Sequence, residues 1–332
     1  MSGIDQTITL AGRAYRLREI AAEDAPAVLA LFKEVFGERP PEGWYAWKYG
    51  AAGLDGRALG LWDEDGRLVA HYAGFPRRLL WHGRPVAGIQ IGDVMVAPHE
   101  RGRLMRQGPF FCVCQTFYQH WIGADKAFTV SYGFPNARHM RLGVHLGFYQ
   151  DRGSVHSWVW PAQAQRLSWF WRVREVQPSD PGFDAWIDAA WLALQRAMPD
   201  RVLGVRDAAH LRARFVARPG VAYRFFQVSR RGFGPGAVAV LRADGETLRW
   251  LDFIGPLNAF AVTAQAIQGV AADWGLLRVE TWAAGAASDA LRTAGGRLSG
   301  EAARFALARP SHCPDETLAT AGWWLAGDTD FL

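Results

Sequence analysis

Residues 91–103 constrain this chain more than any other stretch. An apolar run from Ile91 to Val96 ends at Ala97-Pro98, a turn rich in arginine follows, and an apolar helix is expected from Pro109 to Trp121. A strand that feeds a turn opening a helix presents free N–H groups and the positive end of the helix dipole to an anion. The stretch therefore predicts a phosphate-binding loop in an α/β fold.

A second stretch, residues 134–149, contains a further strand-to-helix connection. A strand ends at Phe134, Pro135-Asn136 breaks it, and a helix follows that closes on Leu146-Gly147-Phe148. Asparagine at this break is suited to capping the helix, and in the sequence alone such a cap looks the same as a ligand-binding residue.

Together the two stretches resemble the GNAT (Gcn5-related N-acetyltransferase) superfamily over about residues 15–150. The family's hallmark is a strand ending in Val-x-Pro, then Arg/Gln-x-x-Gly-x-Gly/Ala opening a helix, then an Asn after a strand and a helix closing on Leu-Gly-Phe. The matching residues stand in the same order: Val96-Ala97-Pro98, Arg101, Asn136 and Leu146-Gly147-Phe148. The two family glycines fall on Leu104 and Arg106, a departure that puts the individual contacts of the loop in question.

The resemblance implies an α/β fold of two GNAT-like units, residues 1–155 and 156–332. Each unit would have a mixed, mostly antiparallel sheet, flanking helices and a splayed central pair of parallel strands. In the first unit these strands start near Asp93 and Ala127. The element order repeats in the second half, but the strand at Leu251–Ile254 is followed by Gly255-Pro256-Leu257-Asn258 and no basic turn. We expect this half to lack a cofactor site and to serve a structural or substrate-shaping role.

Local patterns predict the elements around the first site. Residues 6–18 alternate like one strand, and residues 21–36 form an amphipathic helix. Asp65-Gly66 and His82-Gly83 predict two hairpin turns between short strands.

Composition limits the remaining function classes. The chain has 332 residues, a net charge of +5 and three cysteines, which make no disulfide framework, and the spacing of Cys112 and Cys114 on a helix predicts no metal site. No apolar run reaches the length of a membrane span, and no signal pattern opens the chain. We therefore expect a cytoplasmic protein that binds neither membrane nor nucleic acid; a homodimer remains open.

The resemblance also implies a set of site residues. Acetyl-CoA, or another acyl-CoA, is expected as cofactor, and a backbone N–H of Met95 or Val96 is expected to polarise the thioester carbonyl. The phosphates and the pantetheine arm would be held by Arg101, Gly102, Arg103, Leu104, Met105, Arg106 and Asn136.

An acceptor ammonium must lose a proton before it attacks, and the leaving thiolate needs a donor. Asp93 is the expected base, with His139 and His145 as rivals. The tyrosine that many family members use as the acid would fall on Gly143, so Tyr149 or Tyr132 is expected to replace it.

These features predict an acyl-CoA-dependent N-acyltransferase that acts on a primary amine of a small molecule. Two alternatives stay open. The lost loop glycines and the missing tyrosine fit a GNAT-like protein that binds CoA or a ligand without catalysis. Some tandem-GNAT proteins transfer an amino acid from aminoacyl-tRNA, although that function predicts a coiled-coil arm or a basic groove, and neither is clear in the sequence.

Overall fold

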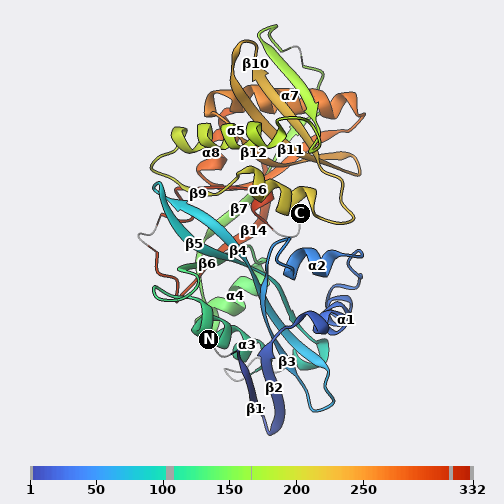
Figure 1. The fold of residues 1–332 in the computed structure, drawn as a ribbon, viewed down its shortest axis with the longest axis vertical. Coiled ribbons are helices and arrows are strands. Elements are labelled where there is room, and N and C mark those ends of the chain that lie inside the picture. The colour runs from blue at the N-terminus through green and yellow to red at the C-terminus, as the bar shows by residue number, and fades with distance from the viewer. Residues whose placement is uncertain (1–2, 102–107, 166, 314–316, 330–332) are drawn as a thin grey trace.

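The protein is described by a computed structural model that covers residues 3–101, 108–165, 167–313 and 317–329. All the strands of this part of the chain belong to one mixed sheet, in the order β1-β2-β3-β4-β5-β6-β14-β7-β13-β12-β11-β10-β8, and β9 and β15 attach beside β4 and β13. Figure 1 shows the N-terminal and C-terminal halves stacked along the longest axis of the molecule. The fold class is the expected one: an α/β fold with two GNAT-like units.

The N-terminal half begins with antiparallel hairpins and continues with alternating helices and strands. Its elements are β1 (Asp5–Leu10), β2 (Arg13–Glu19), η1 (Ala22–Asp24), α1 (Ala25–Phe36), α2 (Trp44–Tyr49), β3 (Arg57–Trp62), β4 (Leu68–Trp81), β5 (Arg84–Val96), η2 (Pro98–Glu100), α3 (Pro109–Trp121), β6 (Val130–Gly133), α4 (Ala137–His145) and β7 (Tyr149–Pro161).

The C-terminal half repeats most of this order, but it opens with a single strand, has an additional short strand between its first two helices and adds one further strand after the repeat. Its elements are β8 (Trp171–Val176), α5 (Phe183–Ala197), β9 (Val202–Gly204), α6 (Ala208–Leu211), η3 (Arg212–Val216), β10 (Arg224–Arg230), β11 (Phe233–Asp244), β12 (Thr247–Ile254), η4 (Leu257–Ala259), α7 (Phe260–Asp273), β13 (Arg278–Gly285), α8 (Ala286–Thr293), β14 (Arg297–Ala308), β15 (Gly322–Leu325) and η5 (Ala326–Asp328).

The strand expected over residues 6–18 is in fact the hairpin β1–β2. Ala11 and Gly12 form its turn with φ values of +48° and +82°. The prediction was wrong because the period-2 alternation continues on both sides of a two-residue turn, and Ala11 gives no sign of the positive φ it adopts.

The short strands expected around the second hairpin merge into two long ones. β4 and β5 pair from Trp81 and Arg84 at the hairpin to Ala70 and Val96 at the far end. Asp93 therefore lies near the end of β5, whereas the sequence analysis placed it at the start of a strand. Most of β4 is buried, whereas β5 is buried mainly from Gly88 to Gln90.

The expected splay between two parallel strands is confirmed. β5 and β6 pair in parallel from Gly88–Val130 to Ile91–Gly133. β6 ends there, whereas β5 continues to Val96. The two strands thus separate at Ile91 and Gly133, and a gap opens beside the last residues of β5.

The two halves share strands. β14, near the C-terminus, pairs with β6 on one side and with β7 on the other. The domain boundary expected between residues 155 and 156 falls within β7, which also pairs with β13. The wall of the gap beyond β6 is consequently built by the C-terminal half.

The second unit has its own parallel pair, β12 and β13, which pair from Thr247–Arg278 to Arg249–Glu280. Beyond this point β15 pairs with β13, and η5 packs against β12. Trp323 and Trp324 of β15 are each only 1% exposed. The chain's own side chains thus fill the region beyond the parallel ladder of the second unit, and the absence of a cofactor site there stays a prediction.

A buried ionic cluster joins the two halves. Arg206 Nε donates to Asp252 over 2.9 Å, and its Nη2 donates to Asp328. Arg77 of β4 reaches the other oxygen of Asp328 over 2.9 Å. Burial raises the pKa of Asp252, although the Arg206 charge opposes that shift. The cluster connects β4, β12 and η5.

Removing one carboxylate from this cluster should destabilise the whole chain. Asp328→Ala leaves two buried guanidinium groups without their shared partner, and we expect the free energy of unfolding to fall by about 3–5 kcal/mol. Asp289→Ala is the matched control, because Asp289 pairs with Arg292 on the surface and should have little effect. Denaturant titration measures both; equal stabilities would contradict the assigned role.

Candidate functional site

A cavity of about 600 Å³ opens where β5 and β6 separate. It draws side chains from both halves of the molecule. The N-terminal half contributes Phe32, Phe36, Glu38, Trp44, Lys48, Ile91, Gly92, Asp93, Val94, Tyr118, Ser131, Tyr132, Gly133, Phe134, Pro135, Asn136, His139 and Tyr149. The C-terminal half contributes Arg218, Trp282, Ala302, Ala303, Ala306 and Ala308.

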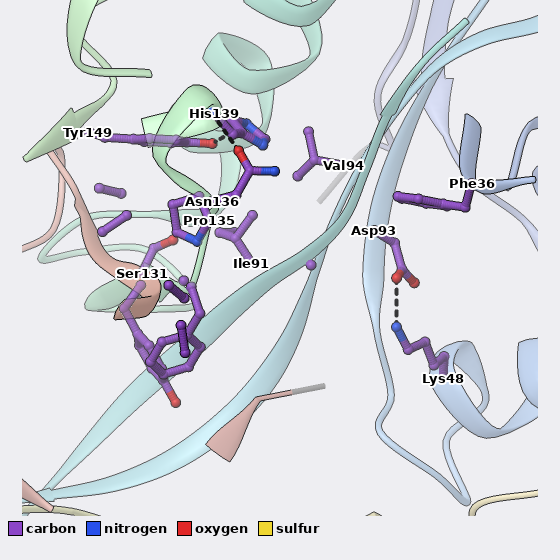
Figure 2. A pocket seen from close by; sticks show the side chains of 18 of the residues that line it. Phe36, Lys48, Ile91, Asp93, Val94, Ser131, Pro135, Asn136, His139 and Tyr149 are labelled. Carbon is purple, nitrogen blue, oxygen red and sulfur yellow. Dashed lines mark hydrogen bonds and ion pairs between the residues drawn. The ribbon is translucent and has the colours of Figure 1, made fainter. Parts of the chain in front are cut away.

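Two groups of polar residues line opposite sides of the cavity. In Figure 2, Tyr149, His139 and Asn136 lie together on one side of the view, and Asp93 and Lys48 lie on the other. Ile91 and Val94 of β5 lie between the groups. A molecule that occupies the gap beside β5 would therefore meet a carboxylate on one side and a tyrosine hydroxyl on the other.

Asp93 is held by two neighbours from α2. Lys48 Nζ lies 2.6 Å from Asp93 Oδ1, and the Tyr49 hydroxyl donates to Oδ2 over 2.7 Å. The two charged side chains are only 3% and 7% exposed. Because both carboxylate oxygens accept hydrogen bonds, the orientation of Asp93 is fixed.

A β-bulge directs Asp93 toward α2. In the pairing of β4 with β5, Ala73 lies opposite Gly92 and His71 lies opposite Met95. Two residues of β5, Asp93 and Val94, therefore lie opposite the single residue Tyr72 of β4. Asp93 adopts a φ of +49°, which is rare for a residue other than glycine.

His71 stabilises this strained backbone. Burial lowers the pKa of His71, so its imidazole is neutral at neutral pH. Its Nδ1 lies 2.7 Å from the carbonyl oxygen of Asp93, and since a carbonyl only accepts, Nδ1 carries the hydrogen.

Tyr149 belongs to a buried chain of hydroxyl groups. The Tyr72 hydroxyl donates to that of Tyr118 over 2.8 Å, and the Tyr149 hydroxyl lies 3.4 Å from Tyr72 and 3.3 Å from His139 Nε2. Since Tyr72 gives its proton to Tyr118, the Tyr149 O–H is the donor in this group. Burial raises the pKa of Tyr149, which therefore keeps its proton.

Gly143 of α4 explains why the expected acid tyrosine is missing. A Cβ atom at Gly143 would lie 1.9 Å from Cδ2 of the Tyr149 ring. The aromatic ring thus fills the space beside α4 from a position six residues later in the chain. A side chain at residue 143 and the present position of Tyr149 exclude each other.

Asn136 caps α4 and also lines the cavity. Its side-chain oxygen accepts from the backbone N–H of His139 over 2.9 Å. The cap fixes the start of α4 at the cavity and leaves the amide nitrogen available to a ligand. The structure is compatible with both interpretations of Asn136 made from the sequence.

The expected phosphate loop is described only in part. Arg101 is exposed and donates from Nε to the carbonyl oxygen of Val96 over 2.9 Å, which folds it back against the end of β5. Gly102, Arg103, Leu104, Met105 and Arg106 lie outside the described residues.

The remaining expected residues lie farther from the two polar groups. The Tyr132 ring packs with Phe305 and Trp324 in a core on the other face of the sheet from Tyr149, although Tyr132 also lines the cavity wall. His145 is exposed at the end of α4, and Met95 is 1% exposed.

Lys48 is the residue that sequence reasoning missed. The aromatic residues around it were noted, but the lysine was not. A signal was present, because the chain has 37 lysines and arginines and only Lys33, Lys48 and Lys126 are lysines. The alanines of β14 carried no comparable signal, since nothing local shows that this strand inserts beside β6.

The described part of the chain shows neither a metal-binding group nor a membrane-spanning helix. In it, no group of His, Cys, Asp and Glu side chains is arranged to hold a metal ion. No helix there is long and apolar enough to cross a membrane.

Comparison with known proteins identifies the fold. Residues 16–107 match the family model described as an acetyltransferase (GNAT) domain. No curated protein sequence matches the chain.

Several solved structures are similar over most of the chain. A probable N-acyltransferase from Enterococcus faecalis aligns with a TM-score of 0.66 and 15% identity, over 90% of this chain and 72% of that one. A GCN5-related N-acetyltransferase from Anabaena variabilis gives 0.63 and 15%, over 88% and 72%. N-myristoyltransferase from Saccharomyces cerevisiae, with bound myristoyl-CoA, gives 0.59 and 10%, over 92% and 85%. At these identities the likeness shows a shared fold.

The packing of Gly143 against Tyr149 can be tested through stability. Gly143→Ala forces the aromatic ring aside, and we expect a loss of about 1–3 kcal/mol. The loss should shrink in a Tyr149→Ala background, which removes the ring. Gly269→Ala is the control, because Gly269 lies in α7 with its nearest neighbour at 3.7 Å, and it should be neutral or stabilising. Additive losses in the double variant would contradict the contact.

His139 should make stability depend on pH. Burial lowers the pKa of His139 to about 4, whereas an unfolded histidine titrates near about 6.5. Between these values the unfolded chain binds more protons, so the free energy of unfolding falls as the pH is lowered from 6.5 to 4. His139→Gln should remove a penalty on the order of 2–3 kcal/mol at the acid end. Denaturant titrations at pH 7 and pH 4.5 measure it; equal pH dependence in both proteins would exclude it.

Proposed function

We propose that this chain is an acyl-CoA-dependent N-acyltransferase that acts on a primary amine of a small molecule. The premise is the GNAT acetyltransferase domain over residues 16–107, which lies within a tandem-GNAT fold. The observation that carries the proposal is the cavity at the splay of β5 and β6. It has a fixed carboxylate, Asp93, on one side and a protonated tyrosine, Tyr149, on the other.

The gap suits the arm of an acyl-CoA. The ladder between β5 and β6 stops at Ile91–Gly133, so the β5 backbone beyond Ile91 faces the cavity and can pair with the amides of a pantetheine. Asn136 lies at the same gap, and Arg101 lies at the end of β5. When bound, the cofactor supplies a thioester, whose carbonyl carbon is open to attack by an amine.

The chain's residues then have separate roles. Asp93 takes the proton of the incoming ammonium, which its negative charge also attracts. A backbone N–H near Met95 or Val96 stabilises the oxyanion, which needs donors fixed in advance. Tyr149, which retains its proton, turns its O–H away from Tyr72 and His139 and donates it to the leaving sulfur.

The acceptor enters past an aromatic wall. Phe32 and Trp44 pack with ring centroids 5.0 Å apart, and Phe36 lies 4.6 Å from Phe32 with 53% of its surface exposed. All three line the cavity on the side of Asp93. The wall excludes water from one face of the amine and leaves an apolar surface for the acceptor.

The first experiment is calorimetry with acetyl-CoA and with longer acyl-CoAs, since a protein of similar fold was solved with myristoyl-CoA. Thiol release is then followed with a panel of small primary amines. Asp93→Asn should lower kcat by about 10²–10⁴-fold with affinity for the cofactor unchanged. Tyr149→Phe should lower it by about 10–100-fold, the equivalent of one hydrogen bond to a charged group.

Tyr45→Phe is the control for removal of a hydroxyl. Tyr45 donates to the carbonyl of Ala21, and it is not among the described residues that line the cavity. Its kcat should match that of the wild type. Failure of every acyl-CoA to bind would overturn the proposal, and wild-type turnover in Asp93→Asn would remove Asp93 as the base.

A further inference from the structure

We propose that Lys48 is itself an acyl acceptor, so that the protein forms a covalent acyl-lysine inside its own cavity. The inference rests on the proposed function, because the acyl group comes from the same thioester. The ε-amine of Lys48 already lies 2.6 Å from Oδ1 of Asp93, the carboxylate proposed as the base.

The use of lysine at this position is the first argument. Only three of the 37 lysines and arginines are lysines, so arginine is the usual cation of this chain. An arginine could equally pair with Asp93, but a guanidinium stays charged and is no nucleophile, whereas an amine can lose its proton and attack. Lys33 and Lys126, the other two, are both exposed.

The position of the amine is the second argument. Lys48 lines the cavity at the splay, and its side chain is 3% exposed. The rings of Trp44 and Phe75 lie 4.8 Å and 4.7 Å from Nζ and hold it in place. A fixed, largely dehydrated amine loses little freedom when it reacts, which favours attack on a neighbouring thioester.

The contact with Asp93 is the third argument. Nζ and Oδ1 are 2.6 Å apart, so a proton can pass along an existing hydrogen bond. The transfer turns a buried ion pair into a neutral pair, which relieves the desolvation penalty that both charges carry. Tyr49 remains bonded to the other carboxylate oxygen throughout.

Asp93 takes one proton from the Lys48 ammonium, and the free amine attacks the thioester carbonyl carbon. The new C–N bond forms and the C–S bond breaks. The thiolate leaves hydrogen-bonded to Tyr149 and receives the second nitrogen proton through that hydroxyl. The products are an amide at Lys48, a free thiol and one proton that Asp93 releases to water.

The experiment incubates the full chain with acetyl-CoA and follows it by intact mass and peptide mapping. We expect one acetyl group per chain at Lys48, with Lys33 and Lys126 unlabelled over the same period. Chemically denatured chain, in which all three lysines are exposed, gives the uncatalysed background. An external amine that the protein accepts should slow the labelling of Lys48, because both compete for one thioester.

Three variants separate catalysis from chance labelling. Lys48→Arg keeps the ion pair and should abolish labelling, whereas Lys33→Arg should leave it unchanged. Asp93→Asn should slow labelling by about 10²-fold or more while calorimetry shows unchanged affinity for acetyl-CoA.

Each outcome decides the proposal. Labelling at Lys48 that needs the folded chain and Asp93 supports it. Labelling spread over the three lysines as in the denatured chain overturns it, and so does an unlabelled Lys48 in protein that turns over an external amine; in that last case the proposed function stands. Absence of binding by any acyl-CoA removes both proposals together.

Discussion

The end of one ladder of hydrogen bonds determines the rest of this structure. β5 and β6 pair in parallel only as far as Ile91 and Gly133, and the residues of β5 beyond that point face a cavity instead of a neighbouring strand. Backbone groups left at such an edge need partners, which makes the gap a natural place for an amide-containing ligand. The bulge at Asp93 lies immediately beyond this point, so the same discontinuity that opens the gap also directs the carboxylate toward α2.

The two halves use the same architecture in opposite ways. In the second unit the chain's own β15 and η5 occupy the region beyond the parallel ladder, and Trp323 packs there in the core. In the first unit β14 pairs with β6 and leaves the gap open, with alanines such as Ala303 and Ala306 on its wall. Small side chains there preserve volume, whereas Trp323 and its neighbours Phe253 and Phe260 fill it in the other unit. The C-terminal half is thus closed at its own parallel pair, and its strand β14 completes the wall of the cavity in the N-terminal half.

The sequence was sufficient for most of the elements up to α8, for the splay and for the helix from Pro109 to Trp121, because these follow from local periodicity and from a motif with fixed spacing. It was insufficient where the chain pairs over long distances. Nothing near residues 297–308 indicates insertion between β6 and β7, since strand pairing depends on residues more than a hundred positions away. The role of Lys48 required the same long-range information, because the bulge that brings Asp93 to it forms only when β4 and β5 pair.

The exchange of Gly143 and Tyr149 shows why a family motif is better compared in space than along the chain. A tyrosine missing from α4 suggests a lost acid, yet the Tyr149 ring from β7 lies where a side chain at residue 143 would begin. Its hydroxyl also belongs to a buried group with Tyr72 and His139, in which Tyr149 is the donor. A glycine at 143 is therefore the condition for this arrangement. The Tyr149 hydroxyl on the adjacent strand thus lies beside the helix position at which the family tyrosine is expected, and it is the donor that the proposed function uses.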